Sequence, residues 1–137
     1  MNLLRSPEYP ATETKGIHTF RYGVYCGENA NDVERVSHAF INGLKHCFAK
    51  REYSFASTDK ENVLIDTLKP AYDSKGQILR LFESSGQKTT CKLVLGDSVE
   101  RVTLCNLLEK AERVLPLKNG KVQLTFKPYE ILTLRVE

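Results

Sequence analysis

The stretch NVLIDTLKPAYDSKGQILRLFESSGQKTTCKLVL, residues 62–95, contains three runs of alternating apolar and polar side chains. The runs cover residues 62–69, 77–82 and 89–95, and the segments between them are rich in Gly, Ser and Asp. A period of two with short polar connections predicts strands joined as antiparallel hairpins. This stretch therefore assigns the chain to the mainly β class.

The same pattern continues to the last residue. Residues 101–108, 121–126 and 131–136 are expected strands, and Asn119-Gly120 predicts a type I′ hairpin turn because both residues tolerate positive φ. Strands at this spacing, without helices between them, pack as two antiparallel sheets face to face. We predict an antiparallel β-sandwich whose main strand block covers residues 62–137.

The sequence changes period before this block. Val33, Val36 and Phe40 recur at helical spacing, and Asn42-Gly43 is a stop signal, so we expect one short helix over about 32–42. Earlier still, HTFRYGVYCG (residues 18–27) alternates and predicts a strand. We expect residues 1–137 to form a single domain, a β-sandwich with one short inserted helix.

Composition narrows the function classes. The chain has 137 residues and a formal net charge of +3, which is a smaller and less clustered excess than nucleic-acid binders carry. It contains no apolar run near the ~20 residues of a membrane span and no secretory leader, so we expect a cytoplasmic protein without membrane contact. The cysteines have no metal-ligand spacing and are expected to be buried free thiols: Cys26, Cys47, Cys91 and Cys105.

The motifs of common catalytic and metal sites do not occur in the sequence. His18, His38 and His46 lack the spacing of a zinc site, and no nucleophile elbow or phosphate-binding loop is present. A basic group follows the expected helix, and we interpret it as a solvated connector rather than a single-strand nucleic-acid site: Lys45, His46, Lys50 and Arg51. We therefore assign no catalytic or metal-binding residue to this chain.

The acidic residues need more care, because a glycosidase can recruit its two carboxyl groups from distant strands. Asp66, Asp73, Glu83 and Glu130 are open to this role by sequence alone. Asp73 lies in a turn, where its side chain is expected to bond the local backbone. Glu83 ends a strand, where a carboxylate usually pairs with arginine or points to solvent.

Arg80 alternates with Ile78 and Phe82 on a strand that is apolar on both faces. A buried guanidinium needs a carboxylate or carbonyl groups for its five donors. We expect Arg80 to form a structural ion pair that holds the two sheets in register.

Several segments together resemble the C-terminal β-region of glycoside hydrolase family 38, the α-mannosidases. The matching residues near the start are LLRSP at 3–7 and then Gly16, His18, Phe20 and Tyr22. The matching residues further on are Lys69, Asp73, Arg80-Leu81-Phe82-Glu83, Gly86, Lys127-Pro128-Tyr129-Glu130-Ile131 and Thr133-Leu134. The resemblance runs through nearly the whole chain in the same order.

This resemblance implies that the chain is the non-catalytic C-terminal β-domain of a large, zinc-dependent, retaining enzyme that cleaves terminal α-mannosides of oligosaccharides. The zinc ligands and the aspartate nucleophile of the family belong to an N-terminal catalytic region, which would be the partner of this chain and its link to carbohydrate. The sequence leaves the oligomeric state open, with a homo-oligomer as one possible assembly. The resemblance gives Arg5 a place near the sugar and gives Arg80, Glu83 and Glu130 structural roles.

A second interpretation is a free-standing carbohydrate-binding or protein-interaction β-sandwich. Such modules present aromatic side chains on one sheet face. Tyr9, Tyr25, Tyr53 and Tyr72 are available, but most of them lie in expected loops.

Overall fold

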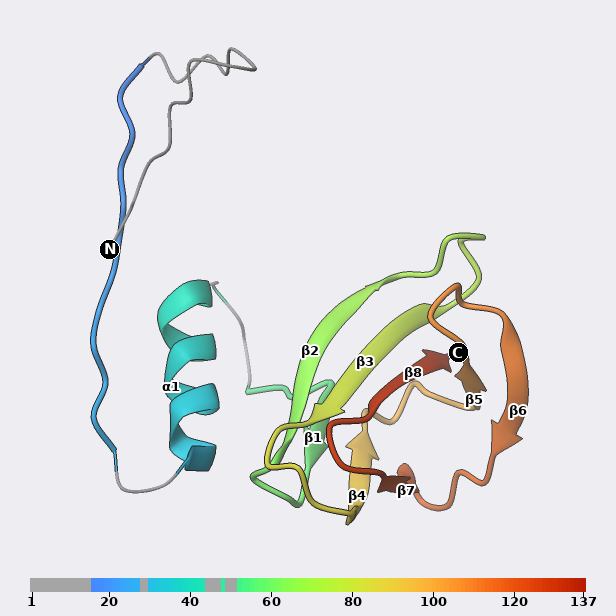
Figure 1. Ribbon diagram of the computed structural model, residues 1–137. Helices are drawn as coiled ribbons and strands as arrows, with labels where there is room; N and C mark the ends of the chain where they lie inside the picture. The colour runs from blue at the N-terminus through green and yellow to red at the C-terminus, as the bar shows by residue number, and fades with distance from the viewer. Residues whose placement is uncertain (1–15, 28–29, 44–47, 49–51) are drawn as a thin grey trace, which may run out of the picture.

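The computed structural model describes residues 16–27, 30–43, 48 and 52–137 (Figure 1). Within these residues the chain forms one helix, α1 (Ala30–Asn42), and eight strands. The strands are β1 (Ala56–Thr58), β2 (Val63–Pro70), β3 (Gln77–Glu83), β4 (Thr89–Leu95), β5 (Val102–Cys105), β6 (Ala111–Leu115), β7 (Lys121–Phe126) and β8 (Ile131–Val136). The prediction of a mainly β chain with one short helix is confirmed.

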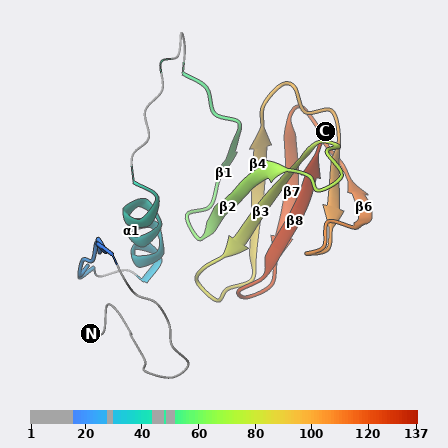
Figure 2. The same ribbon diagram turned by 90° about the horizontal axis from the view of Figure 1, so that it is seen from above.

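The strands form two antiparallel sheets that lie one over the other (Figure 2). One sheet has the order β1-β4-β7 and the other has the order β2-β3-β8-β5-β6. The last strand, β8, pairs with β3 on one side and β5 on the other, so the chain ends in the middle of the larger sheet. The predicted sandwich is therefore confirmed, with a topology that the strand pattern alone does not specify.

The core fills the space between the two sheets. On β4 and β7 the burial alternates without interruption, and every buried residue of these two strands except Thr89 is apolar. The core side chains include Leu79, Leu81, Leu93, Val122, Phe126 and Leu134, all with no exposed surface. At roughly 25 cal/mol per Å² of apolar area removed from water, this layer is the main source of fold stability.

Two turn predictions are confirmed in detail. Asn119 and Gly120 both adopt positive φ, at 50° and 68°, as a type I′ hairpin turn requires. Gly43 ends α1 with a φ of 63°, and its N–H donates to the carbonyl of Ala39 at 2.9 Å. Each position favours a residue that tolerates left-handed backbone geometry.

The expected strand over residues 101–108 is wrong in its second half. β5 ends at Cys105, because the Asn106 side chain accepts hydrogen bonds from the N–H groups of Leu108 and Lys110 at 3.0 and 3.1 Å. Such local bonds reverse the backbone and compete with a strand ladder. The chain then returns as β6, which the sequence pattern missed because four of its five residues are exposed.

The strand expected over residues 18–27 is also not formed in this chain, since residues 16–27 carry no strand assignment. Figure 1 shows this segment running beside α1, to one side of the sandwich. The prediction of buried thiols is confirmed for Cys91 and Cys105 and wrong for Cys26, which is exposed on this segment. Cys47 lies outside the described residues.

No helix among the described residues is long and apolar enough to span a bilayer.

Candidate functional site

The most tightly bonded polar group of the sandwich is the carboxylate of Glu83, at the last residue of β3. Glu83 is 1% exposed, which makes it the one buried carboxylate among the described residues. Burying a charge is costly unless hydrogen bonds replace the lost water. Glu83 therefore requires a full set of donors.

One carboxylate oxygen bonds the side chains and backbone that flank the β3–β4 loop. Oε1 accepts from the Asn62 side-chain amide at 2.8 Å and from the Ser85 N–H at 2.9 Å, and it also accepts from the Ser85 hydroxyl. The Asn62 amide also lies 2.7 Å from the Thr89 hydroxyl at the start of β4. Through Oε1, Glu83 therefore connects Asn62, the residue before β2, to the loop between β3 and β4.

The other oxygen bonds backbone amides from two different turns. Oε2 accepts from the N–H groups of Gly86 and Gln87 at 2.8 and 3.1 Å, and from the N–H of Tyr129 at 3.0 Å. Tyr129 lies in the β7–β8 turn, 46 residues further along the chain. We call Asn62, Glu83, Ser85, Gly86, Gln87 and Tyr129 the Glu83 cluster.

These bonds set the protonation state of the carboxylate. Burial acts to raise the pKa of Glu83, but the hydrogen bonds from Ser85, Tyr129 and Asn62 outweigh it and lower the pKa to about 2. A buried carboxylate that stays ionised and has donors on both oxygens neither reaches a substrate nor exchanges protons near neutral pH. The Glu83 carboxylate is therefore ionised at neutral pH, and both of its oxygens are occupied by donors from the protein.

Tyr129 and Glu130 complete the β7–β8 turn. Tyr129 has a φ of 57°, and its ring packs so closely on Gly86 that a Cβ there would lie 2.6 Å from ring atoms. The Glu130 carboxylate accepts from the N–H of Lys127 at 2.7 Å, and the Glu130 carbonyl accepts from the N–H of Glu83 at 3.1 Å. Glu83 and Glu130 thus both bond backbone amides, whereas an arginine or solvent was expected for Glu83.

A second polar group lies at the opposite end of β3, around the loop formed by residues 106–110. Glu109 pairs with Lys69 and accepts from the N–H of Tyr72 at 2.7 Å. The hydrogen bond from Lys69, followed by that from Tyr72, lowers the pKa of Glu109. These contacts fasten the β5–β6 loop to the chain that leaves β2.

Asp73 and Arg135 continue this group. Asp73 accepts from the N–H of Lys75 at 3.1 Å, as the turn predicted, and pairs with Arg135 at 2.9 Å. The local bond from Lys75 is the main cause that lowers the pKa of Asp73, and the bond and charge of Arg135 act in the same direction. Arg135 also donates to the carbonyl of Glu109 at 3.3 Å.

Arg80 has a different partner from the one expected. It alternates with the core residues Leu79 and Leu81, so it lies on the outer face of its sheet, where it donates to the carbonyl of Leu107 at 3.0 Å. No carboxylate of the described residues is within ion-pair distance of it. Arg80 therefore holds a loop and does not link the two sheets.

Three buried polar atoms on this face have no hydrogen-bond partner among the described residues: Arg80 Nε, Thr133 Oγ1 and Arg135 Nε.

An open hollow of about 460 Å³ lies where the edges of the two sheets separate, between β6 and β7. Lys88, Arg113 and Lys127 surround its apolar floor. The one acid that lines it, Glu130, has an oxygen taken by the Lys127 N–H. This hollow does not hold the pair of carboxyl groups that glycoside cleavage needs.

Five residues singled out in the sequence lie outside the described residues: Arg5, Lys45, His46, Lys50 and Arg51. In the part of the chain that the structure describes, no three or more His, Cys, Asp or Glu side chains gather as a metal site. The sequence did not indicate that Asn62 and Tyr129 bond Glu83, or that Glu109 bonds Lys69 and Tyr72. The available signal was the turn residues that follow Glu83 and Asn106, because turns bring such side chains close to backbone amides.

The chain resembles known proteins over most of its length. Residues 62–134 match the glycosyl hydrolases family 38 C-terminal beta sandwich domain. Alpha-mannosidase 2C1 of Mus musculus and that of Homo sapiens are each 29% identical to the chain over 148 residues, and alpha-mannosidase G of Dictyostelium discoideum is 27% identical over 150. Each alignment covers 98% of this chain but 14% of the relative, so the chain spans about one seventh of these proteins' length.

The charge of Glu83 predicts a specific pH dependence of stability. Because its pKa falls from an ordinary 4.5 to about 2 on folding, its contribution is complete above pH 4.5 and disappears as the pH falls toward 2. We expect Glu83→Gln to lower the free energy of unfolding at pH 7 by about 1.5–3 kcal/mol, since bonds to a charged group are lost. Urea unfolding of both forms from pH 7 to pH 2 should show this difference shrinking below pH 4.5.

Glu112→Gln is the matched control for this series, because Glu112 is exposed on β6. It should stay within about 0.5 kcal/mol of the wild type. A Glu83→Gln variant whose deficit is the same at every pH would show that the charge of Glu83 is not what stabilises the cluster.

Gly86 predicts a backbone effect. Its φ of 72° is a geometry that L side chains rarely adopt, and a Cβ there meets only the far end of the Tyr129 side chain, which is 70% exposed and can rotate away. We therefore expect Gly86→Ala to lower the free energy of unfolding by about 1–2 kcal/mol, mainly through the backbone. In the background of Tyr129→Ala the same substitution should cost nearly as much, and a much smaller cost there, measured by thermal or urea unfolding, would show that the ring contact is the cause.

Proposed function

The chain belongs to the glycosyl hydrolase family 38 C-terminal beta sandwich domains, and from this premise we propose that it supports the catalytic region of a larger α-mannosidase. In this proposal the whole enzyme is a zinc-dependent, retaining hydrolase of terminal α-mannosides of oligosaccharides. The 137 residues contribute a rigid sandwich and no catalytic group.

The observation that carries the proposal is the extent of the alignment. Nearly the whole chain aligns with a small part of each α-mannosidase relative. A polypeptide of their length has room for a catalytic region as the partner of this sandwich. The chemistry of the described residues supports this division of labour.

A retaining glycosidase places two carboxyl groups about 5–5.5 Å apart, one as nucleophile and one as acid and base. In this chain the acids with defined partners are already occupied. Glu83 accepts N–H bonds on both oxygens, Glu109 holds Lys69 and Tyr72, and Asp73 holds Lys75 and Arg135. We therefore propose that Glu83, Glu130 and Arg80 maintain the turns and the β5–β6 loop, and that the reacting carboxyl groups belong to the catalytic region.

The described residues do not fit a zinc ion. Zinc in an enzyme is usually held by three protein ligands that converge within about 2.0–2.3 Å. The described residues offer no cluster of three ligating side chains, and His18 and His38 lie on the N-terminal segment and on α1. In the proposed enzyme the zinc belongs to the catalytic region.

Arg5 is the residue of this chain that we propose to reach the substrate. The segment LLRSP matches the place where relatives carry an arginine near the sugar, as the family resemblance implies. A guanidinium can donate two parallel hydrogen bonds to neighbouring hydroxyl groups or to a carboxylate. Arg5 would thus position substrate and would not take part in proton transfer.

We further propose a cytoplasmic location. Cys91 and Cys105 are free thiols, and the exposed Cys26 is also free. Free thiols persist in reducing compartments, whereas oxidising compartments favour disulfides.

The alternative of a free-standing carbohydrate-binding module has less support. Its exposed aromatic platform would need side chains on one face, but Tyr72 follows β2 while Tyr129 lies in the β7–β8 turn. These positions are at opposite ends of the sandwich, because β3 begins near the first and ends near the second.

The division of labour predicts the activity of two preparations. The intact polypeptide should hydrolyse an aryl α-mannoside. The 137-residue chain alone should show no turnover with or without added zinc, because its described residues offer no pair of free carboxyl groups that face each other. Release of the aryl group is the measurement. Turnover by a clean preparation of the chain alone would contradict the supporting role, and an inactive, folded intact polypeptide would contradict the α-mannosidase assignment.

Arg5→Ala in the intact polypeptide predicts a kinetic effect without a stability effect. Loss of a charge-assisted hydrogen bond worth about 1.5–3 kcal/mol should lower kcat/KM about 10- to 100-fold. The free energy of unfolding should stay within about 0.5 kcal/mol. Arg5→Lys is the control, since it keeps the charge but loses the paired donors, and a fall in stability with unchanged kinetics would assign Arg5 a structural role.

A further inference from the structure

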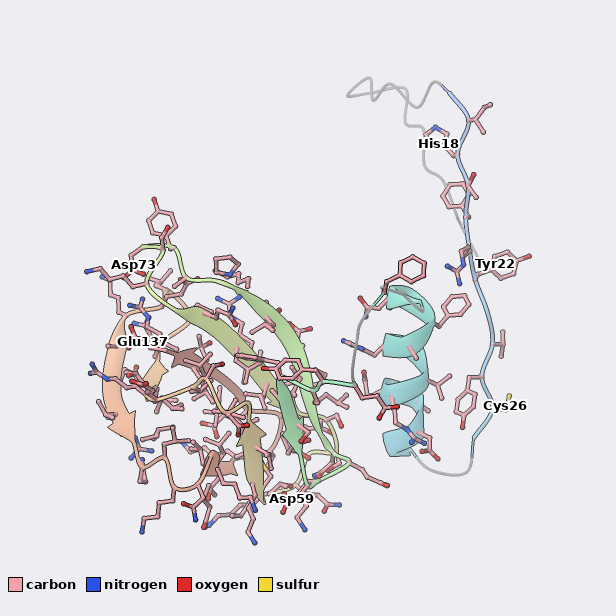
Figure 3. The ribbon with its side chains drawn as sticks, turned by 180° about the vertical axis from the view of Figure 1, so that it is seen from behind. His18, Tyr22, Cys26, Asp59, Asp73 and Glu137 are labelled. Atoms are coloured by element: carbon pink, nitrogen blue, oxygen red, sulfur yellow. The ribbon has the colours of Figure 1, made fainter. Side chains whose placement is uncertain are left out.

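Residues 16–27 form an extended segment with large apolar side chains in water. Ile17 and Val24 are more than 90% exposed, and Tyr22 is 68% exposed. Figure 3 shows Tyr22 and Cys26 pointing away from α1. An exposed apolar stretch of this size marks an interaction surface.

The segment has the alternating side-chain pattern of a β-strand, but its backbone does not form the hydrogen bonds of a strand with other described residues. Apolar and aromatic side chains occupy every second position at Phe20, Tyr22 and Val24, and Arg21 and Gly23 lie between them. None of the backbone hydrogen bonds between described residues involves positions 19–27. The N–H and C=O groups of this stretch are therefore available to a partner.

Helix α1 covers one side of the segment. The guanidinium of Arg21 lies 5.1 Å from the centre of the Phe40 ring, and a Cβ at Gly23 would lie 3.7 Å from the same ring. Val33 and Val36 line the hollow between α1 and Gly23. The helix thus acts as a backing that leaves the other face and the backbone edges of the segment open.

The sheet edges of the sandwich itself do not offer a matching partner. β1 has three residues, and β2 has a bulge between Ile65 and Thr67 and ends at Pro70. β6 has a bulge opposite Leu104 and Cys105 and exposes Glu112 and Arg113, and β7 begins with an exposed Lys121. Short length, bulges, proline and edge charges are the features that prevent strand addition.

We propose that residues 17–25 are a β-strand that completes a sheet in the larger part of the enzyme, by pairing along an open sheet edge of the catalytic region. This inference rests on the proposed function and names the contact through which the sandwich is joined to its partner. Main-chain hydrogen bonds would supply the affinity, and alternate apolar side chains would supply the register.

The lengths of the relatives favour this partner over a second copy of the chain. The alignments leave only about three residues of this chain uncovered, so they include most of the segment. Each relative is also about seven times as long as this chain. In every relative, the matching segment is therefore part of a polypeptide that contains about six times as many further residues. The segment has its partner in the same molecule.

Amide hydrogen exchange tests this pairing. We compare residues 19–25 in the 137-residue chain and in the intact polypeptide, and we expect at least about 100-fold slower exchange in the intact polypeptide only. Fast exchange in both preparations overturns the proposal even when the intact polypeptide hydrolyses mannoside, so its failure is distinct from failure of the proposed function. Slow exchange in the chain alone also overturns it, in favour of the chain's own sheet edges if the chain is monomeric, or of a second copy if it is dimeric.

Proline substitution gives a second test in the intact polypeptide. Tyr22→Pro and Gly23→Pro each remove one N–H from the centre of the strand. Because successive N–H groups point to opposite edges of a strand, one of the two variants removes a ladder bond and should restore fast exchange at the neighbouring residues. Glu52→Pro is the matched control, since Glu52 lies in an exposed connection and makes no backbone hydrogen bond to another described residue, and it should leave exchange in residues 19–25 unchanged. Tyr22→Ala keeps the N–H and separates the loss of the ring from the loss of a ladder bond. Unchanged protection in both Tyr22→Pro and Gly23→Pro would overturn the strand assignment.

Discussion

The buried carboxylate of Glu83 is the constraint around which one end of the sandwich is arranged. Its two oxygens accept from three regions that are distant in sequence: Asn62, the loop after β3, and Tyr129. A charge with 1% exposure persists only because these donors replace water. The positions of both turns at this end therefore depend on one side chain.

The opposite end is held by a different device. There the β5–β6 loop lies over the outer face of the larger sheet. Lys69 pairs with the carboxylate of Glu109 in this loop, and Arg80 and Arg135 donate to the carbonyl groups of Leu107 and Glu109. On the larger sheet, Thr103 and Thr133 are buried, with 5% and 2% of their surfaces exposed. The sandwich thus has charged side chains bonded to its own loops at both ends.

The alternating pattern was sufficient to predict the class of the fold, because a strand with one buried face must repeat every two residues. It placed β2, β3, β4, β7 and β8 within about a residue, and local chemistry placed the turn at Asn119-Gly120 and the end of α1. It failed where burial did not alternate or where a side chain bonded its own backbone, as at β6 and Asn106. It also failed at residues 18–27, whose pattern is that of a strand but which form no strand ladder with the other described residues.

The sequence by itself determined the sandwich, its helix and the likeness to a family, since periodicity, turn residues and motif order are all local properties. Only the tertiary structure decided which carboxylates are occupied, because the donors of Glu83 and Glu109 come from segments up to 46 residues away. The same holds for Arg80, whose partner is a loop carbonyl that strand spacing cannot reveal. Pairing across the chain depends on strand order, and strand order is fixed by the packing of the whole molecule.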